Sequence, residues 1–314
     1  MEIVYVICSD HPFPSGGIMK LYQFVDILNL NGIPSFVVHK KKGFRINWFI
    51  NSTQIIDYQS IIVKKDDILI LPEGYAASIP NLYPGIRKII YNQNSFNTLR
   101  PFYDDPRAAS IAYNHPDVVQ ILVVSNYDLI ALEMMFPGNN KSLIHTSINE
   151  KLFHYHPHKT KTIAVMPRKM WDDFSYLHSL LKLKDEINGY TFNVINDLTL
   201  EETAKVLKES SIFLSFSHKE SFGLPPAEAM ACGCIVIGYH GQGGKEFFRN
   251  TISYPIEQSD IPGYAKRIIN VVNKFEEDPE KMNWMGQKAS AFILENYSTS
   301  QQQSAILEMI RKFI

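Results

Sequence analysis

Residues 211–239 constrain the fold more than any other stretch, because two apolar runs there enclose a glycine turn and a short helical pattern. The runs 211–217 (SIFLSFS) and 234–239 (CIVIGY) have the length and composition of buried strands. Pro225 and Pro226 suit the first turn of a helix, where a missing N–H costs little. Gly233 suits the left-handed residue that follows a helix. Strand, loop, helix and strand in this order predict part of a parallel sheet.

Two carboxylates, Glu220 and Glu228, flank the glycine turn of this stretch and lie eight positions apart. A helix that begins at the carboxyl end of a parallel strand points its unpaired N–H groups and positive dipole end at that edge, where phosphate binds well. We expect Glu220 to precede this loop and Glu228 to lie in the first helical turn. Both would then reach hydroxyl groups of a ligand whose phosphates rest between them. The alternative is an ordinary strand–turn–helix with two solvated glutamates.

Apolar runs alternate with helical patterns along the whole chain, which is typical of parallel α/β layers. Strands are expected at residues 3–8, 35–39, 68–71, 88–91, 121–124, 141–144, 162–166, 191–195, 212–216 and 235–238. The pattern breaks near Phe153, and 314 residues suffice for two domains of common size. We predict an α/β fold of two Rossmann-like domains, residues 1–156 and 157–297, with a cleft between them and a final helix at 298–314.

Composition excludes several classes of protein. The 31 basic and 32 acidic side chains nearly cancel, which argues against bulk electrostatic binding to nucleic acid. No apolar stretch approaches the roughly 18 residues of a membrane-spanning helix, and the first residues predict a buried strand instead of a signal peptide. Cys8, Cys232 and Cys234 fall at predicted strand or helix ends without a disulfide pattern. A cytoplasmic location is therefore expected.

The run that starts at Glu220 resembles the signature of the retaining nucleotide-sugar glycosyltransferases of the GT-B fold, family 4, also called glycosyl transferases group 1. That signature is Glu, seven residues and Glu, with Phe-Gly after the first Glu and Glu-Ala-Met-Ala around the second. The resemblance implies that Glu220 contacts the donor sugar near its reacting carbon and that Glu228 contacts the ribose. Glu246 follows a second glycine turn and is expected to support the site. Further donor-binding residues on this reading are Ser221, Phe222, Gly223 and Leu224.

The resemblance extends over most of the chain. Gly16 and Gly17, after the first strand, are similar to a glycine pair whose backbone approaches the donor phosphate. Residues 123–153 are similar to the segment that ends the first domain, and the final helix is expected to cross back onto that domain. The implied reaction moves a sugar from a nucleotide diphosphate sugar to a hydroxyl of a glycan or lipid-linked acceptor. The second domain would hold the donor and the first the acceptor, with no cofactor.

Three departures from the family pattern limit what can be assigned. Arg168 matches an arginine at the start of the second domain, but Lys169 is not at the usual distance of the family lysine. We still predict Arg168 and Lys169 as catalytic cations that stabilise the leaving diphosphate, and Glu220 as the catalytic carboxylate that orients the sugar and stabilises positive charge at its anomeric carbon. Residues 91–95 lack the histidine found in many members, so no general base is assigned. Residues 172–196 lack the usual glycine turn, which leaves the nucleotide-base pocket open.

Other patterns leave alternatives open. The chain has no Asp-x-Asp, and His154, His156 and His158 are predicted to be a linker, so no metal site is assigned. Residues 40–49 mix cations with aromatics. They are either a peripheral contact with anionic lipid at the inner face of a membrane or, slightly favoured, a solvated turn followed by a strand. A silent nucleotide-sugar-binding subunit, an epimerase and a phosphorylase remain alternative functions.

Overall fold

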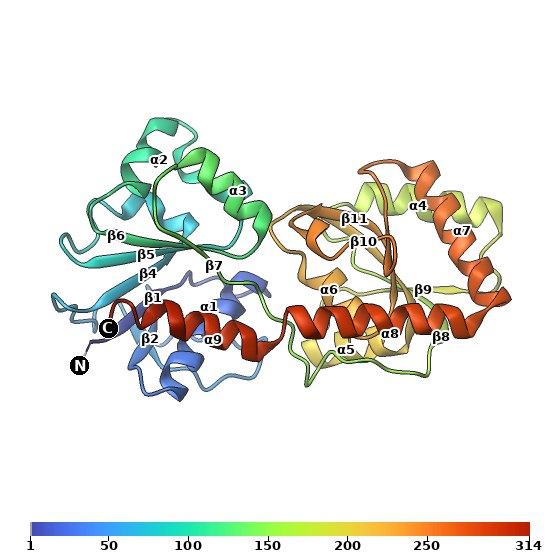
Figure 1. Ribbon diagram of the computed structural model, residues 1–314, viewed down its shortest axis with the longest axis horizontal. Helices are drawn as coiled ribbons and strands as arrows, with labels where there is room; N and C mark the ends of the chain where they lie inside the picture. Colours follow the sequence, from blue (N-terminus) through green and yellow to red (C-terminus); the bar gives the residue numbers. More distant parts are fainter. Residues whose placement is uncertain (1) are drawn as a thin grey trace. The chain divides into compact units, whose positions relative to one another are not determined.

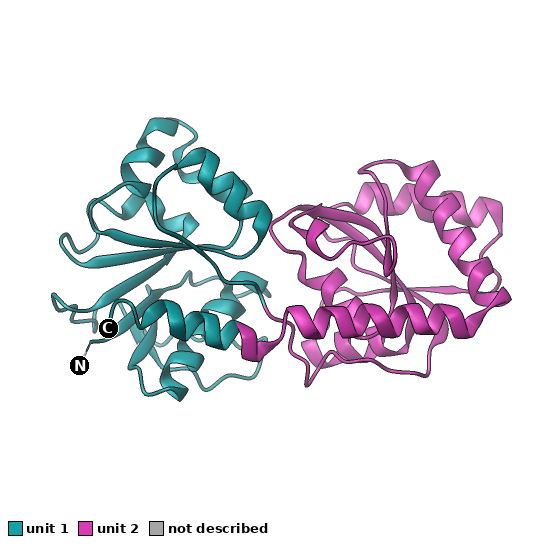
Figure 2. Cartoon of the chain, in the orientation of Figure 1, with its two compact units in different colours: residues 1–146, 302–314 teal, residues 147–301 magenta. Residues whose placement is uncertain are grey.

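The computed structural model describes residues 2–314 and contains two parallel sheets, each covered by helices on both faces (Figure 1). Contacts divide the chain into two compact units (Figure 2). Unit 1 contains the chain up to Thr146 together with Gln302–Ile314, and unit 2 is Ser147–Gln301. The predicted α/β class, with two Rossmann-like sheets, is confirmed.

Unit 1 is built on a seven-stranded sheet in the order β3-β2-β1-β4-β5-β6-β7, with all neighbouring strands parallel. Helices α1 and α9 cover one face of this sheet, and α2 and α3 cover the other. The strands are β1 Val4–Ile7, β2 Ser35–His39, β3 Ile55–Asp57, β4 Ile68–Pro72, β5 Arg87–Asn92, β6 Val118–Val123 and β7 Lys141–Leu143. The helices are α1 Gly16–Leu30, α2 Pro106–Tyr113, α3 Asn126–Met135 and α9 Thr299–Ile310, with 3-10 turns η1 Glu73–Ser78, η2 Ser95–Asn97 and η3 Arg100–Phe102.

Unit 2 is built on a five-stranded parallel sheet in the order β12-β11-β10-β8-β9. Helices α5, α6 and α8 pack on one face, and α4 and α7 pack on the other. The strands are β8 Thr160–Val165, β9 Thr191–Val194, β10 Ser210–Glu220, β11 Ile235–Gln242 and β12 Ser253–Pro255. The helices are α4 Trp171–Lys184, α5 Leu200–Glu209, α6 Leu224–Ala231, α7 Ile261–Glu277 and α8 Pro279–Asn296, with the 3-10 turn η4 Gly243–Glu246.

The division between the units differs from the expected boundaries at 156/157 and 297/298. Ile148 and Phe153 lie in the apolar core of unit 2, and the Ile148 N–H donates to the Tyr297 carbonyl at 2.8 Å. The chain therefore joins unit 2 directly after Thr146. At the other end, Ile306 and its neighbours in α9 pack into the core of unit 1, which accounts for the assignment of the C-terminal residues to that unit.

Residues 40–49 do not form the strand that the favoured alternative predicted, because strand structure resumes only at Ile55. Lys40, Lys41 and Lys42 are exposed, as expected for a solvated turn. The aromatic rings behave differently from the lysines, since they are partly buried against the core of unit 1: Phe44, Trp48 and Phe49. The cations and the aromatics of this stretch therefore do not share one exposed surface.

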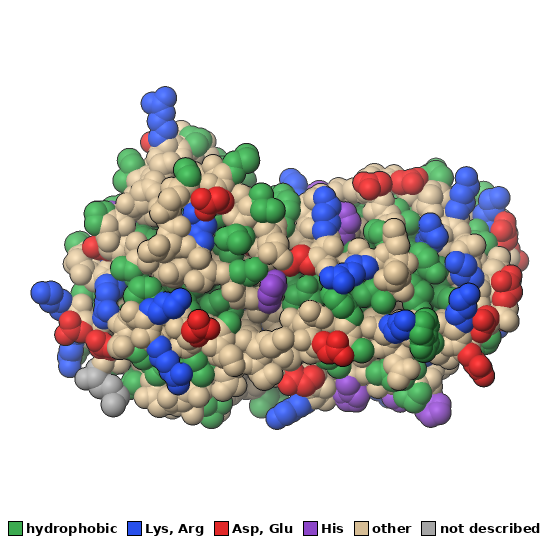
Figure 3. All heavy atoms as spheres, viewed as in Figure 1, with side chains coloured by type: hydrophobic (Ala, Val, Ile, Leu, Met, Phe, Trp, Pro, Cys, Tyr) green, Lys and Arg blue, Asp and Glu red, His purple; other side chains and the backbone are tan. Residues whose placement is uncertain are grey.

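The three cysteines, Cys8, Cys232 and Cys234, are buried as free thiols. The Cys234 thiol donates to the Leu207 carbonyl at 3.0 Å. Within residues 2–314, no helix is long and apolar enough to span a bilayer. Cations and carboxylates are interspersed over the face drawn in Figure 3, in keeping with the near-zero net charge.

Helix α8 approaches the turn between α6 and β11 so closely that only glycine fits at the contact. A Cβ atom on Gly286 would lie 2.3 Å from the Gly233 carbonyl oxygen. Gly233 itself has φ +86° and follows α6, as predicted from the sequence. Helix α8 thus packs directly on the backbone of Gly233, which cannot move aside as a flexible side chain would.

Replacing Gly286 with alanine should destabilise the protein, because the added methyl group meets a backbone carbonyl. We expect a loss of about 1–3 kcal/mol in the free energy of unfolding, typical of overpacked cores, measured by thermal denaturation. Gly74→Ala is the matched control, since a Cβ there meets nothing within 4 Å and the residue does not have positive φ. Equal melting temperatures for the two variants would contradict this account of the α8 contact.

Candidate active site

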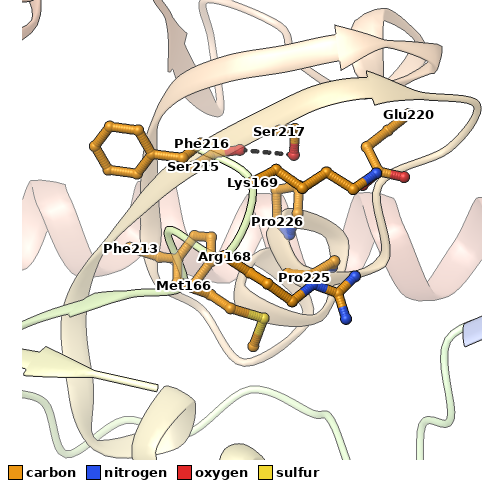
Figure 4. A pocket seen from close by; sticks show the side chains of 10 residues that line it. All are labelled: Met166, Arg168, Lys169, Phe213, Ser215, Phe216, Ser217, Glu220, Pro225 and Pro226. Carbon is orange, nitrogen blue, oxygen red and sulfur yellow. Dashed lines mark hydrogen bonds and ion pairs between the residues drawn. The ribbon is translucent and has the colours of Figure 1, made fainter. Parts of the chain in front are cut away.

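The carboxyl ends of β8 and β10 lie side by side in unit 2 and bring charged residues together. Val165 of β8 pairs with Leu214 of β10 in parallel register. Arg168 and Lys169 follow β8, and Glu220 is the last residue of β10. All three line one pocket, which Figure 4 shows from close by. The other residues that line it are Met166, Phe213, Ser215, Phe216, Ser217, Pro225 and Pro226.

An ion pair joins two of the predicted catalytic residues, since Lys169 Nζ lies 2.6 Å from Glu220 Oε1. The side chains are 38% and 26% exposed, so solvent screens the pair and its contribution to stability is small. The ion pair instead fixes the positions of the carboxylate and the ammonium group on the wall of the pocket. Arg168 extends separately, beside Pro225 (Figure 4). Lys169, in the loop that follows β8, thus reaches Glu220.

Few backbone N–H groups are available to a ligand where α6 begins. Gly223 precedes the helix with φ +93°, a conformation that favours glycine. The first three helical residues are Leu224, Pro225 and Pro226, so Leu224 alone among them carries a backbone N–H. An anion at this helix end would therefore be bound by Leu224 and the loop before it, with the cations supplying the rest of the positive charge.

Glu228 was predicted to lie in the first helical turn, and this prediction is wrong. Helix α6 begins at Leu224, which makes Glu228 its fifth residue and places it in the second turn. The residue is buried, with 7% of its surface exposed, and its backbone carbonyl accepts the Cys232 N–H at 3.0 Å. The prolines misled the prediction, because they occupy the second and third helical positions instead of the first.

Side chains of the same loop anchor it to the core of unit 2. Phe222 is buried, with its ring centroid 5.2 Å from that of Phe247 and 5.1 Å from that of Tyr297. Ser221 is also buried, and Leu224 packs partly against the same core. The side chains thus point away from solvent. That the backbone of this loop faces the donor stays a prediction.

A second glycine turn, Gly241–Gly244, holds the loop from the other side. A Cβ on Gly243 would lie 1.8 Å from the Ser221 carbonyl oxygen, so the two backbones are in direct contact. Gly241 has φ +66°, and a Cβ there would lie 2.9 Å from that of Glu220. Glu246 ends the 3-10 turn η4, which begins at Gly243. Burial of Tyr297 raises the pKa of its hydroxyl, and the nearby charge of Glu246 raises it further. The turn therefore fixes the position of Glu220 and of the residues that follow it.

Sequence reasoning missed His240 and two serines. The Gln242 N–H donates to His240 Nδ1 at 3.0 Å, across a turn in which Gln242 has φ +86°. Burial, and then the charge of Lys245, lower the pKa of His240, which keeps Nδ1 available as an acceptor. Ser215 and Ser217 share one face of β10, with their hydroxyl oxygens 3.1 Å apart. The period of two along a strand could have identified the serines.

Gly16 and Gly17 lie in unit 1, at the start of α1 and outside the pocket of unit 2. Gln93 Nε2 donates to the Gly17 carbonyl at 3.0 Å, and a Cβ on Gly17 would lie 2.7 Å from Gln93 Oε1. The Gln93 N–H in turn donates to Glu73 Oε2 at 3.0 Å, and burial raises the pKa of Glu73 to about 7. Polar groups thus collect at the carboxyl edge of this sheet too.

Two parallel-sheet units, each with polar groups at the carboxyl edge, define the fold. The fold is the GT-B fold of glycosyltransferases. Sucrose-phosphate synthase from Thermosynechococcus elongatus superposes with a TM-score of 0.74 at 12% identity, over 99% of each chain. Anabaena Alr3699/HepE in complex with UDP superposes with a TM-score of 0.71 at 12% identity, over 99% of this chain and 100% of that one.

The sequence comparisons agree with the fold. Residues 179–292 match the family model described as "Glycosyl transferases group 1". The alpha-1,6-glucosyltransferase of Actinobacillus pleuropneumoniae serotype 7 (strain AP76) is 29% identical over 289 residues, which cover 87% of this chain and 84% of the relative. Residues 179–292 therefore match a glycosyl transferases group 1 domain, and the sequence and fold comparisons together support a glycosyltransferase.

Gly243→Ala should impair sugar transfer strongly, because the new methyl group displaces the backbone between Glu220 and Gly223. A displacement of about 1 Å at a reacting centre can cost about 100-fold in rate. Gly244→Ala is the matched control, since a Cβ there meets only side chains at 3.4 Å or more. Transfer rates and melting temperatures of both variants check the prediction. It fails if the two variants transfer sugar equally fast.

Proposed function

We propose that the protein is a retaining, metal-independent family 4 enzyme that transfers a hexosyl group from a nucleotide diphosphate sugar to a hydroxyl group of a glycan or lipid-linked acceptor. Unit 2 binds the donor and unit 1 the acceptor. The observation that carries the proposal is the meeting of Arg168, Lys169 and Glu220 at the edge where α6 begins. Two cations and one carboxylate there suit a ligand with a diphosphate and a sugar.

The main chemical demand is the negative charge that builds on the leaving diphosphate. The Arg168 guanidinium takes two phosphate oxygens in a fork, and Lys169 shares its ammonium group between Glu220 and the diphosphate. The Leu224 N–H and the loop before it add fixed dipoles. The bond from the anomeric carbon to the diphosphate oxygen breaks, and the acceptor oxygen bonds to the same face of that carbon. The acceptor proton leaves with the diphosphate.

Glu220 has the complementary task of stabilising positive charge on the sugar. Its carboxylate lies on the pocket wall, and Lys169 holds one of its oxygens. This interaction grows as the anomeric carbon becomes positive, so it favours the transition state over the bound donor. Glu228 and Glu246 hold the ribose and the glycine turn in this proposal, with Gly16 and Gly17 near the donor phosphate.

The proposed donor is UDP-glucose. Solved complexes of Anabaena Alr3699/HepE contain UDP or UDP-glucose. The relative in Actinobacillus pleuropneumoniae is named an alpha-1,6-glucosyltransferase. A hydroxyl group of a saccharide is therefore the proposed acceptor.

A cytoplasmic location belongs to the same proposal, because three buried free thiols suit a reducing compartment. The exposed Lys40–Lys42 would supply any peripheral contact with an anionic membrane.

The decisive test is transfer from UDP-glucose to glucose, isomaltose and methyl glucosides, followed by proton NMR of the product. We expect an α-linked product, because retention carries the α-configuration of the donor into the new bond. Excess chelator is expected to leave the rate unchanged, since Arg168 and Lys169 supply the positive charge. A β-linked product, or a rate that chelator abolishes and magnesium restores, would overturn the proposed mechanism.

Glu220→Gln should lower turnover by about 100-fold while the KM for the donor changes only a few-fold, because charge stabilisation in the transition state is lost. Steady-state kinetics with varied donor measure both constants. Glu257→Gln, on an exposed part of unit 2, is the control for the loss of one charge. Wild-type turnover in Glu220→Gln would remove Glu220 from the catalytic role.

A further inference from the structure

The loop between β1 and α1 is held firmly at its first residues. Asp10 accepts hydrogen bonds from the backbone N–H groups of Lys40 at 3.1 Å and Lys41 at 2.8 Å. The same carboxylate contacts His39 Nδ1 at 3.0 Å, and His39 Nε2 is 2.7 Å from the Tyr22 hydroxyl. His39 and Tyr22 are buried. One carboxylate thus joins this loop to the end of β2 and, through His39, to α1.

The far end of the loop is held as well. Gln93, which follows β5, donates its side-chain N–H to the Gly17 carbonyl at 3.0 Å. The amide lies close against Gly17, since a Cβ there would lie 2.7 Å from Gln93 Oε1. Asp10 and Gly17 therefore mark two fixed points on the carboxyl edge of the unit 1 sheet, which is the edge where open α/β sheets bind ligands.

Between these points the chain is stiff and carries an exposed ring. Pro12 and Pro14 flank Phe13, where the chain bends, and each proline limits its own backbone and disfavours helical backbone in the residue before it. Phe13 is nonetheless 66% exposed, although most large aromatic side chains of the unit contribute to its cores. His11 meets the ring edge-on, with centroids 5.4 Å apart and an interplanar angle of 66°. The ring is thus presented to solvent at little cost in conformational entropy on binding.

We propose that Phe13 is a stacking platform for a sugar ring of the acceptor, an inference that rests on the proposed glycosyl transfer. A pyranose presents a face of C–H groups, which an aromatic face covers, and a rim of hydroxyl groups, which need polar partners. Asp10 and Gln93 place polar groups at the two ends of the loop, and the Ser15 side chain, which makes no cap hydrogen bond to α1, lies between them. The site therefore selects saccharide acceptors and sets the orientation of the ring that receives the new sugar.

A lipid bilayer matches the surface around Phe13 less well than a saccharide does. The neighbouring lysines are exposed, but the rings of Phe44, Trp48 and Phe49 turn toward the core of unit 1. Stable insertion into the interface requires a larger apolar face than one ring on a loop that also carries a carboxylate. A single flat ring between two fixed points matches one saccharide unit.

The test compares Phe13→Ala, Phe13→Trp and the control Tyr103→Ala, which removes an aromatic ring of similar exposure (69%) elsewhere in unit 1. Phe13→Ala should raise the KM for the acceptor roughly 10-fold, the loss expected for one stacked aromatic contact. The KM for UDP-glucose and its hydrolysis without acceptor should stay at wild-type values. Phe13→Trp should restore acceptor binding, and Tyr103→Ala should behave as wild type.

A binding measurement separates this inference from the proposed function. Saturation-transfer NMR with isomaltose and methyl glucosides should detect binding to the wild type and to Phe13→Trp, and much weaker binding to Phe13→Ala. Equal saccharide binding by wild type and Phe13→Ala, or none by wild type, overturns the platform even where transfer is observed. Phe13→Ala that loses only binding to phosphatidylglycerol vesicles overturns it in favour of a lipid surface. Absence of transfer with intact saccharide binding counts against the proposed function alone.

Discussion

The parallel register of β8, β10 and β11 is the constraint on which the rest of the candidate site in unit 2 depends. Parallel strands end at one edge, so residues that follow β8 must meet residues that end β10. Lys169 and Glu220 are 51 positions apart in the sequence (220 − 169 = 51), yet their charged atoms lie 2.6 Å apart. A shift in register between Ser217 and Glu220 adds one residue to β10 relative to β11, and Lys219 has φ +50° there. This bulge brings Glu220 opposite Gln242.

The loop that follows Glu220 is positioned chiefly by what its neighbours lack. Gly243 has no side chain, so its backbone lies directly on the Ser221–Phe222 peptide. Pro225 and Pro226 remove two N–H groups and limit the conformations of the first helical turn. Phe222 then fixes the loop from within the core. A site fixed by backbone contacts has few soft degrees of freedom, which suits groups that must be in place before charge develops.

Much of this architecture follows from local patterns, and the remainder depends on distant contacts. Apolar runs identify strands such as β10 because a buried parallel strand must be apolar on both faces. β3 was missed because its three residues are only partly buried. Glu228 was placed one turn too early because a proline pair does not reveal which helical position it occupies. His240 could not be found from sequence, since its role depends on one hydrogen bond across a turn. The Asp10–His39–Tyr22 chain likewise joins three separate elements.

Charge and apolar contact are divided between the two units, and this division follows from the demands of the proposed reaction. The pocket of unit 2 contains two cations and one carboxylate among its lining residues, which leaves one positive charge before a donor arrives. The ion pair of Lys169 and Glu220 lowers the desolvation cost of these two charges, because the groups attract each other and both remain partly exposed to solvent. In the proposed reaction, the donor diphosphate accepts a hydrogen bond from Lys169 while Glu220 keeps its own bond to the same ammonium group, which has three N–H donors. Recognition of an uncharged saccharide needs no such charge, and unit 1 offers a rigid ring with amide, hydroxyl and carboxylate groups around it instead.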